Sequence, residues 1–141
     1  MDTLKEVDSS TILQKVMSVV ASAKQEILAT MDITEEIENP LPLEYFFLLK
    51  KKIKSGVKVT RLAFGTIAEF KIFNERYETK DKYYKCILAA TKNYKRMLLV
   101  DGKHLFFAAD VKDRRKFFYT TNSRYIKKFS RYFYRELKLA E

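Results

Sequence analysis

The chain has 141 residues, of which 47% are hydrophobic and 14% aromatic, and its formal net charge is +10. We expect residues 1–141 to form a single domain, and no apolar run is long enough to cross a bilayer. The N-terminus is acidic and has no apolar stretch, which excludes a secretory signal there. Cys86 is the one cysteine, so an internal disulfide is excluded and a reducing, cytoplasmic location is predicted.

The charge is distributed unevenly along the chain. Residues 1–48 carry three lysines against nine acidic residues, a net charge of −6. Residues 49–141 carry 25 basic residues against nine acidic ones, a net charge of +16. This asymmetry predicts two surfaces of opposite potential, one of which suits an anionic partner or an acidic patch on another subunit.

The first half of the chain predicts a helix, a strand and a loop. Ser9 or Ser10 can cap a helix that runs to about Ser22, because apolar residues recur there at helical spacing. A strand is predicted at 25–31, followed by an acidic loop that ends at 39–42. The acidic side chains expected to face solvent in this loop are Glu35, Glu36 and Glu38.

A second helix is predicted to start after Pro42 and to stop near Ser55 and Gly56, which form a good C-terminal signal. The residues expected on its broad buried face are Leu43, Phe46, Phe47 and Ile53. Further apolar residues fall on its other side, namely Tyr45, Leu48 and Leu49. A helix that is apolar on more than one face favours a second contact, such as a dimer partner.

The second half predicts mainly strands. They are expected at 57–64, 85–90, 96–100, 104–109 and 117–121, with a short helix at 66–77. Asp101 and Gly102 form a strong signal for a two-residue hairpin turn.

The last helix, from about 122 to 139, has the clearest pattern. Ile126, Phe129, Phe133 and Leu137 share one apolar stripe. Six cations fall on the opposite arc and are expected to face outward: Arg124, Lys127, Lys128, Arg131, Arg135 and Lys138.

The order of these elements resembles one repeat of the phospholipase D superfamily. The resemblance implies an α/β fold in which a mixed β-sheet is flanked by helices. It spans nearly the whole chain but is carried by short segments, namely Ser22–Ile27, Ser55–Val59, Arg96–Lys103 and Thr120–Asn122.

Active members of that superfamily carry the signature H-x-K-x-x-x-x-D. When Asp101 sets the register, Tyr94 stands at the histidine position and Arg96 at the lysine position. In active members the histidine attacks phosphorus, and a phenol does not replace it in that mechanism. The one histidine, His104, lies just beyond the hairpin and outside the signature, so we expect the chain not to be an enzyme.

Metal and cofactor sites have little support in the sequence. One histidine, one cysteine and no carboxylate pair with ligand spacing leave little to hold zinc. The glycine-rich motifs that bind nucleotides are absent from the sequence. No metal and no cofactor are therefore predicted.

Non-catalytic domains of this type occur in TrmB-type archaeal transcription regulators, where they take part in effector sensing and dimerisation. The resemblance thus implies a regulatory or ligand-sensing module that forms a homodimer. Its candidate ligand site is the degenerate signature, with Tyr94, Arg96 and Asp101 near the floor and Asn122 close by. Arg96 keeps a positive charge there, which suits a small anionic effector. Turn chemistry alone is an equally open explanation of Asp101.

The alternative function is nucleic-acid binding by the basic face of the last helix. Its six cations could neutralise several phosphates, and three aromatic residues lie near enough in sequence to offer stacking surfaces: Tyr119, Tyr125 and Tyr132. A solvated helix exterior explains the same pattern. Membrane binding is not expected, because the apolar stripe of this helix is needed for the core.

Overall fold

The computed structural model describes residues 4–77 and 80–141, within which seven strands form one sheet and five helices surround it. The strands are β1 (Lys5–Val7), β2 (Glu26–Asp32), β3 (Lys58–Phe64), β4 (Tyr84–Leu88), β5 (Met97–Val100), β6 (His104–Val111) and β7 (Arg114–Thr120). The helices are α1 (Ile12–Ala21), α2 (Ile33–Glu38), α3 (Leu43–Lys54), α4 (Ile67–Tyr77) and α5 (Ser123–Ala140).

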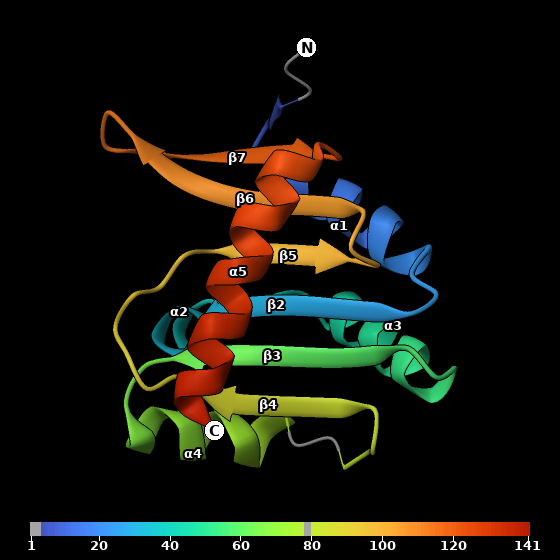
Figure 1. Cartoon of the computed structure of the whole chain (residues 1–141). Helices are drawn as coiled ribbons and strands as arrows, with labels where there is room; N and C mark the ends of the chain where they lie inside the picture. The colour runs from blue at the N-terminus through green and yellow to red at the C-terminus, as the bar shows by residue number, and fades with distance from the viewer. Residues whose placement is uncertain (1–3, 78–79) are drawn as a thin grey trace.

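The sheet is mixed and has the strand order β1-β7-β6-β5-β2-β3-β4. β2, β3 and β4 run parallel, and every other neighbouring pair is antiparallel. Helix α5 crosses one face of the sheet alone, while α1 and α3 lie against the other face (Figure 1). The expected α/β fold with a mixed sheet between helices is therefore confirmed.

Alternation along the central strand β2 builds the core on both faces of the sheet. Ile27 and Ala29 pack in the cluster formed with α1 and α3. Leu28 packs in the opposite cluster, with Phe129 and Phe133 of α5. Because β2 is buried on both faces, it reads in the sequence as an apolar run without a polar side.

Most of the segment that was predicted to be an acidic loop forms helix α2 (Ile33–Glu38). Asp32 caps it by accepting a hydrogen bond from the backbone N of Glu35 at 3.3 Å. Glu36 turns inward, and its side chain is only 12% exposed to solvent. The expectation that the whole acidic segment faces solvent is wrong at Glu36, because a buried cation lies within reach of it.

The buried face of α3 also differs from the expected one. Tyr45, Leu49 and Ile53 are buried, whereas Leu43 and Phe47 are 66% and 63% exposed. Packing against α1 and β3 buries the row of residues at i, i+4 and i+8, namely Tyr45, Leu49 and Ile53. Several rows of this helix are apolar, so the sequence pattern alone did not show which of them is buried.

Helix α5 matches its predicted pattern. Phe129 and Phe133 are buried, and Ile126 and Leu137 pack against the same cluster. All six cations expected on the outer arc are exposed. Asn122 caps the helix by accepting from the backbone N of Arg124 at 2.9 Å. In the described part of the chain, no helix has both the length and the apolarity to span a membrane.

Candidate ligand-binding site

The residues of the degenerate signature that precede β5 lie where β2 ends and α2 begins. β5 runs antiparallel to β2, so the start of β5 meets the carboxyl end of β2. Thr30 holds this junction: its hydroxyl donates to Lys95 O at 2.6 Å and accepts from Met97 N at 3.0 Å. Arg96, between those two residues, is thereby directed toward α2.

The guanidinium of Arg96 forms an ion pair with Glu35, and Arg115 of β7 donates to the same carboxylate at 3.0 Å. Burial alone would raise the pKa of Glu35, but the charges and hydrogen bonds of Arg96 and Arg115 outweigh it and hold that pKa below its ordinary value. Glu35 is therefore ionised at neutral pH and already balances much of the charge on Arg96.

A second ion pair lies deeper. Arg61 projects from the middle of β3, and its Nη2 lies 3.7 Å from Glu36 Oε1, with exposed side-chain fractions of 6% and 12%. The Arg61 guanidinium also lies over the Phe73 and Phe46 rings, at 5.4 and 5.9 Å from their centroids. Burial raises the pKa of Glu36 even though Arg61 and Arg96 lower it.

Two polar atoms of this cluster are buried without a hydrogen-bond partner within the described residues: Glu36 Oε2 and Arg96 Nε. Buried polar groups in proteins are nearly always satisfied, so each unsatisfied one calls for a reason. Here one is an acceptor and the other a donor, and both residues line the same cavity.

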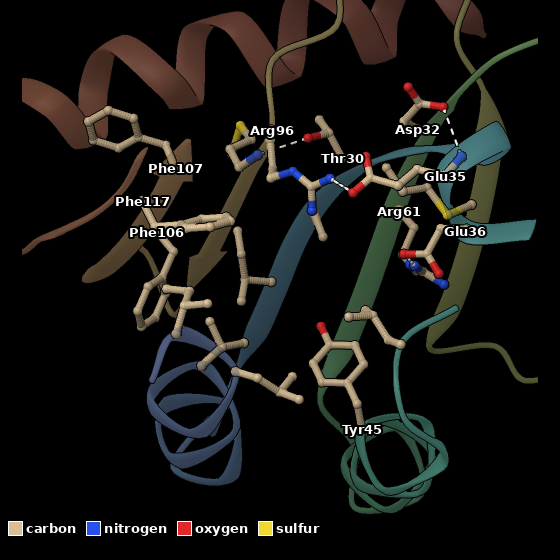
Figure 2. Close-up of a pocket in the computed structure, with 18 of the residues that line it drawn as sticks. Thr30, Asp32, Glu35, Glu36, Tyr45, Arg61, Arg96, Phe106, Phe107 and Phe117 are labelled. Carbon is tan, nitrogen blue, oxygen red and sulfur yellow. Dashed lines mark hydrogen bonds and ion pairs between the residues drawn. The ribbon is translucent and has the colours of Figure 1, made fainter. Parts of the chain in front are cut away.

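That cavity, which we call the inner pocket, has a volume of about 210 Å³ and lies between the sheet and α1, α2 and α3. Figure 2 shows Arg96 reaching toward Glu35, with Phe106 and Phe117 on one side and Arg61 and Glu36 on the other. The inner pocket thus has an apolar part and a charged part, which is the usual make-up of a small-molecule site.

A second cavity, which we call the outer hollow, lies on the α5 side of the same residues and has a volume of about 470 Å³. It shares Asp32, Tyr94, Arg96 and Phe107 with the inner pocket. Its further charged residues are Lys95, Asp110, Arg115 and Lys128. Arg96 and Tyr94 therefore stand between two cavities on opposite faces of the sheet.

Tyr94 is a neutral phenol in this setting. Its ring lies 5.3 Å from that of Phe64, and burial raises its pKa to about 12. It stands at the edge of both cavities, as the predicted ligand site requires, but it offers a hydroxyl and an aromatic face rather than a charge.

The structure does not bring Asp101 and Asn122 to Tyr94 and Arg96, which corrects the expectation of one shared floor. Asp101 follows β5 while Arg96 precedes it, so the length of the strand, roughly 15 Å, separates them. Thr120, which precedes Asn122, pairs with Leu105 at the same far end of the sheet. Strand connectivity, rather than sequence spacing, decides which residues meet.

Asp101 instead fastens the loop before β2 to the hairpin. Its carboxylate accepts hydrogen bonds from the backbone N atoms of Lys24, Gln25 and Glu26 at 2.9, 2.8 and 2.9 Å. Asp101 and Gly102 have φ values of 53° and 65°, and Lys103 N donates to Val100 O at 3.0 Å, so the predicted turn forms at these residues. The loop has three residues rather than the predicted two, because Val100 pairs with His104. The turn explanation of Asp101 therefore applies, with a structural role added to it.

Sequence reasoning missed four residues of the site: Glu35, Glu36, Arg61 and Arg115. One signal was available, because an arginine in the middle of the apolar run 57–64 has to be buried or to break the strand. Among residues 4–77 and 80–141, no group of three histidine, cysteine, aspartate or glutamate side chains is placed to hold an ion.

The fold defines a class: the chain has a phospholipase D-like fold. No protein-family model matches the sequence, and no curated protein does. The structure is similar to that of NucT from Helicobacter pylori, with 16% identity, a TM-score of 0.68 and coverage of 97% of this chain and 95% of that one. It is also similar to Nuc from Salmonella typhimurium, a phospholipase D family member, with 12% identity, a TM-score of 0.62 and coverage of 98% and 94%.

A further similar structure is that of TrmBL2, an archaeal chromatin protein that shows a novel mode of DNA binding. The identity is 19% and the TM-score 0.72, over 100% of this chain and 54% of TrmBL2. This chain therefore spans about half the length of TrmBL2. The likeness to TrmB-type proteins that the sequence suggested is confirmed at the level of the fold.

The role of Asp101 gives a testable prediction. Asp101→Ala removes the acceptor of three backbone N–H groups and should lower the free energy of unfolding by about 2 kcal/mol at pH 7. Asp101→Asn should lower it less, because asparagine keeps one acceptor oxygen and tolerates a positive φ. Urea unfolding monitored by circular dichroism measures both.

The effect should depend on pH. Burial would raise the pKa of Asp101, but the three hydrogen bonds hold it below the ordinary value of 3.8. The carboxylate therefore stabilises the fold above that ordinary value, and its contribution is lost as the pH falls through the lower, folded pKa. The exposed Asp110 is the control, and equal losses for Asp101→Ala and Asp110→Ala would contradict the assignment.

Proposed function

We propose that this chain is a non-catalytic phospholipase D-like module that binds a small ligand in the inner pocket and thereby regulates a DNA-associated protein. The observation that carries the proposal is the buried Arg61–Glu36 ion pair in the lining of that pocket, where Glu36 and Arg96 each also have one buried polar atom without a hydrogen-bond partner. A buried ion pair contributes little net stability, because desolvation offsets the attraction between the charges. Its presence at a cavity favours a role in binding.

The absence of phosphodiester chemistry is supported by the state of the signature residues. Tyr94 is a neutral phenol whose pKa is raised to about 12 by burial. The charge of Arg96 is engaged by Glu35. His104 lies beyond β5, and its Nδ1 is 2.7 Å from the Tyr119 hydroxyl.

An anionic effector, which Arg96 suggested in the sequence, would suit the outer hollow better than the inner pocket. In the inner pocket, carboxylates already balance the guanidinium groups. In the outer hollow, Lys95 and Lys128 add two amines to its lining. The location of a bound anion would therefore distinguish the two cavities.

The proposal predicts binding without turnover. Ligand-observed NMR with a set of small aromatic fragments should detect binding to the wild-type chain and to Ala21→Leu, which alters an exposed residue of α1. Ala29→Leu places extra side-chain volume in the inner pocket and should abolish that binding. Bis(p-nitrophenyl) phosphate should not be hydrolysed by any of the three proteins.

Two results would contradict this proposal. Fragments that bind Ala29→Leu as well as the wild type would place the ligand elsewhere. Hydrolysis of bis(p-nitrophenyl) phosphate that is lost in Tyr94→Phe would show a catalytic role for Tyr94.

Self-association is the second part of the regulatory hypothesis, and the exposed apolar residues of α3 support it. Leu43 and Phe47 expose two thirds of their surface, which is unusual for neighbouring large apolar residues on one helix. We predict a dimer in sedimentation velocity that Phe47→Glu dissociates, while the same type of charge change at the exposed Lys127→Glu on α5, across the sheet, leaves it intact. A wild-type chain that is monomeric at millimolar concentration would remove this part of the hypothesis.

Nucleic-acid binding by α5 is the alternative function, and the six exposed cations on that helix favour it. The similarity to TrmBL2 makes DNA a reasonable partner to test. Stacking by Tyr119 and Tyr132 is not available. Tyr132 is 4% exposed and donates to Asn93 O at 2.6 Å, and Tyr119 faces Lys15 of α1. Tyr125 of α5 stays partly exposed beside Phe107, so a contact through α5 would be mainly electrostatic with at most this one ring available for stacking.

The electrostatic nature of such a contact can be measured by fluorescence anisotropy with a generic DNA duplex. Replacing Arg124, Lys127 and Arg131 by glutamine should weaken binding and reduce the slope of log affinity against log salt by up to about 3. The matched control replaces the exposed Lys50, Lys51 and Lys54 of α3 by glutamine, on the other face of the sheet. No binding at low salt, or equal losses in both triple variants, would exclude α5 as the interface.

A further inference from the structure

We infer that the inner pocket selects an uncharged amphipathic molecule, with an apolar body of about the size of an aromatic ring and a primary amide or hydroxyl head. The inference rests on the proposed function, because it names the chemistry of the ligand in that same pocket. It follows from three properties of the pocket: its apolar walls, its charge balance and the charged side chains at one end.

The walls suit an apolar body of limited size. Ile12 and Val16 of α1 line the cavity together with Leu98, Phe106 and Phe117 of the sheet. The volume of about 210 Å³ is somewhat larger than that of an engineered apolar cavity of about 150 Å³ that holds benzene. One aromatic ring and a short linker therefore fill it.

The charged part of the pocket is already electrically balanced. Its carboxylates are Asp32, Glu35 and Glu36, and its guanidinium groups are those of Arg61, Arg96 and, through Glu35, Arg115. A ligand with a net charge would leave one charge uncompensated beside the buried Arg61–Glu36 pair, which opposes binding. An uncharged head avoids that penalty.

The head has to be polar because charged side chains line one end of the pocket, namely those of Glu35, Glu36 and Arg96. A primary amide or a hydroxyl both accepts and donates hydrogen bonds, so one such group can pair with a carboxylate and with a guanidinium group. A carboxylate lacks the donor, and an ammonium group lacks the acceptor.

The inference is tested with three probes that share one body and differ in the charge of the head: 3-phenylpropanamide, 3-phenylpropanoate and 3-phenylpropylamine. Isothermal titration calorimetry at pH 7 on the whole chain should give an affinity for the amide at least tenfold higher than for either charged probe. The amide should not bind Ala29→Leu, and it should bind Ala21→Leu as it binds the wild type.

Variants of the charged residues provide an independent check. Arg96→Gln keeps a donor but leaves the pocket with an excess negative charge, so the preference should shift at least tenfold toward 3-phenylpropylamine. Glu36→Gln should shift it toward 3-phenylpropanoate by a similar factor, provided that circular dichroism shows the variant to be folded. Glu38→Gln changes an exposed residue of α2 outside the pocket and should leave all three affinities unchanged.

The outcomes test the head of the ligand and its location separately. If a charged probe binds as tightly as the amide, and Ala29→Leu abolishes its binding, the uncharged head is wrong but a ligand still binds in the inner pocket. Binding of the amide that is insensitive to Ala29→Leu, or no binding of any probe or fragment to the wild type, overturns both.

Discussion

A guanidinium group buried in the middle of a sheet strand is the constraint on which this site depends. Arg61 lies on β3 among apolar neighbours and keeps only 6% of its side-chain exposure. An isolated charge there would be strongly destabilising, so the fold has to supply an anion. Glu36 supplies it, and for that the chain after β2 must turn at once into α2. The same short helix carries Glu35, which engages Arg96 and Arg115. One buried cation thus accounts for the position of the whole charged cluster.

The two ends of β5 have different roles because the sheet keeps them apart. At one end Arg96 and Tyr94 stand between the inner pocket and the outer hollow. At the other end Asp101 accepts three backbone hydrogen bonds and fixes the loop that leads into β2. Tyr94, Arg96 and Asp101 are close in the sequence motif, but β5 lies between them. Tyr94 and Arg96 therefore line a cavity, whereas Asp101 stabilises the fold.

The shared fold by itself does not determine a function, since similar structures belong to Nuc, NucT and a chromatin protein. A function has to be argued from the side chains at the end of β2 and the start of β5. We propose that the phenol of Tyr94 and the arginine held by Glu35 serve recognition rather than covalent chemistry at phosphorus. The proposed role as a binding module follows from these residues, and the fold explains only where they are placed.

The sequence by itself determined most of the elements, because they depend on local patterns. Apolar spacing located α1, α3 and α5, and apolar runs located β2 to β7 within a few residues. The stripe of Phe129 and Phe133 predicted the buried face of α5, and Asp101–Gly102 predicted the hairpin. These features depend on residues that are neighbours along the chain.

Only the tertiary structure decided the site. The order of the strands brings Arg61, Glu36 and Arg96 together, although they are far apart in sequence. The same order places Asp101 and Asn122 at the opposite ends of the strands. A local pattern says which residues are apolar, but it does not say which strands become neighbours. Partners for buried charges depend on that choice, so Glu36 appeared in the sequence as one of several solvated acids and in the fold as the counter-ion of Arg61.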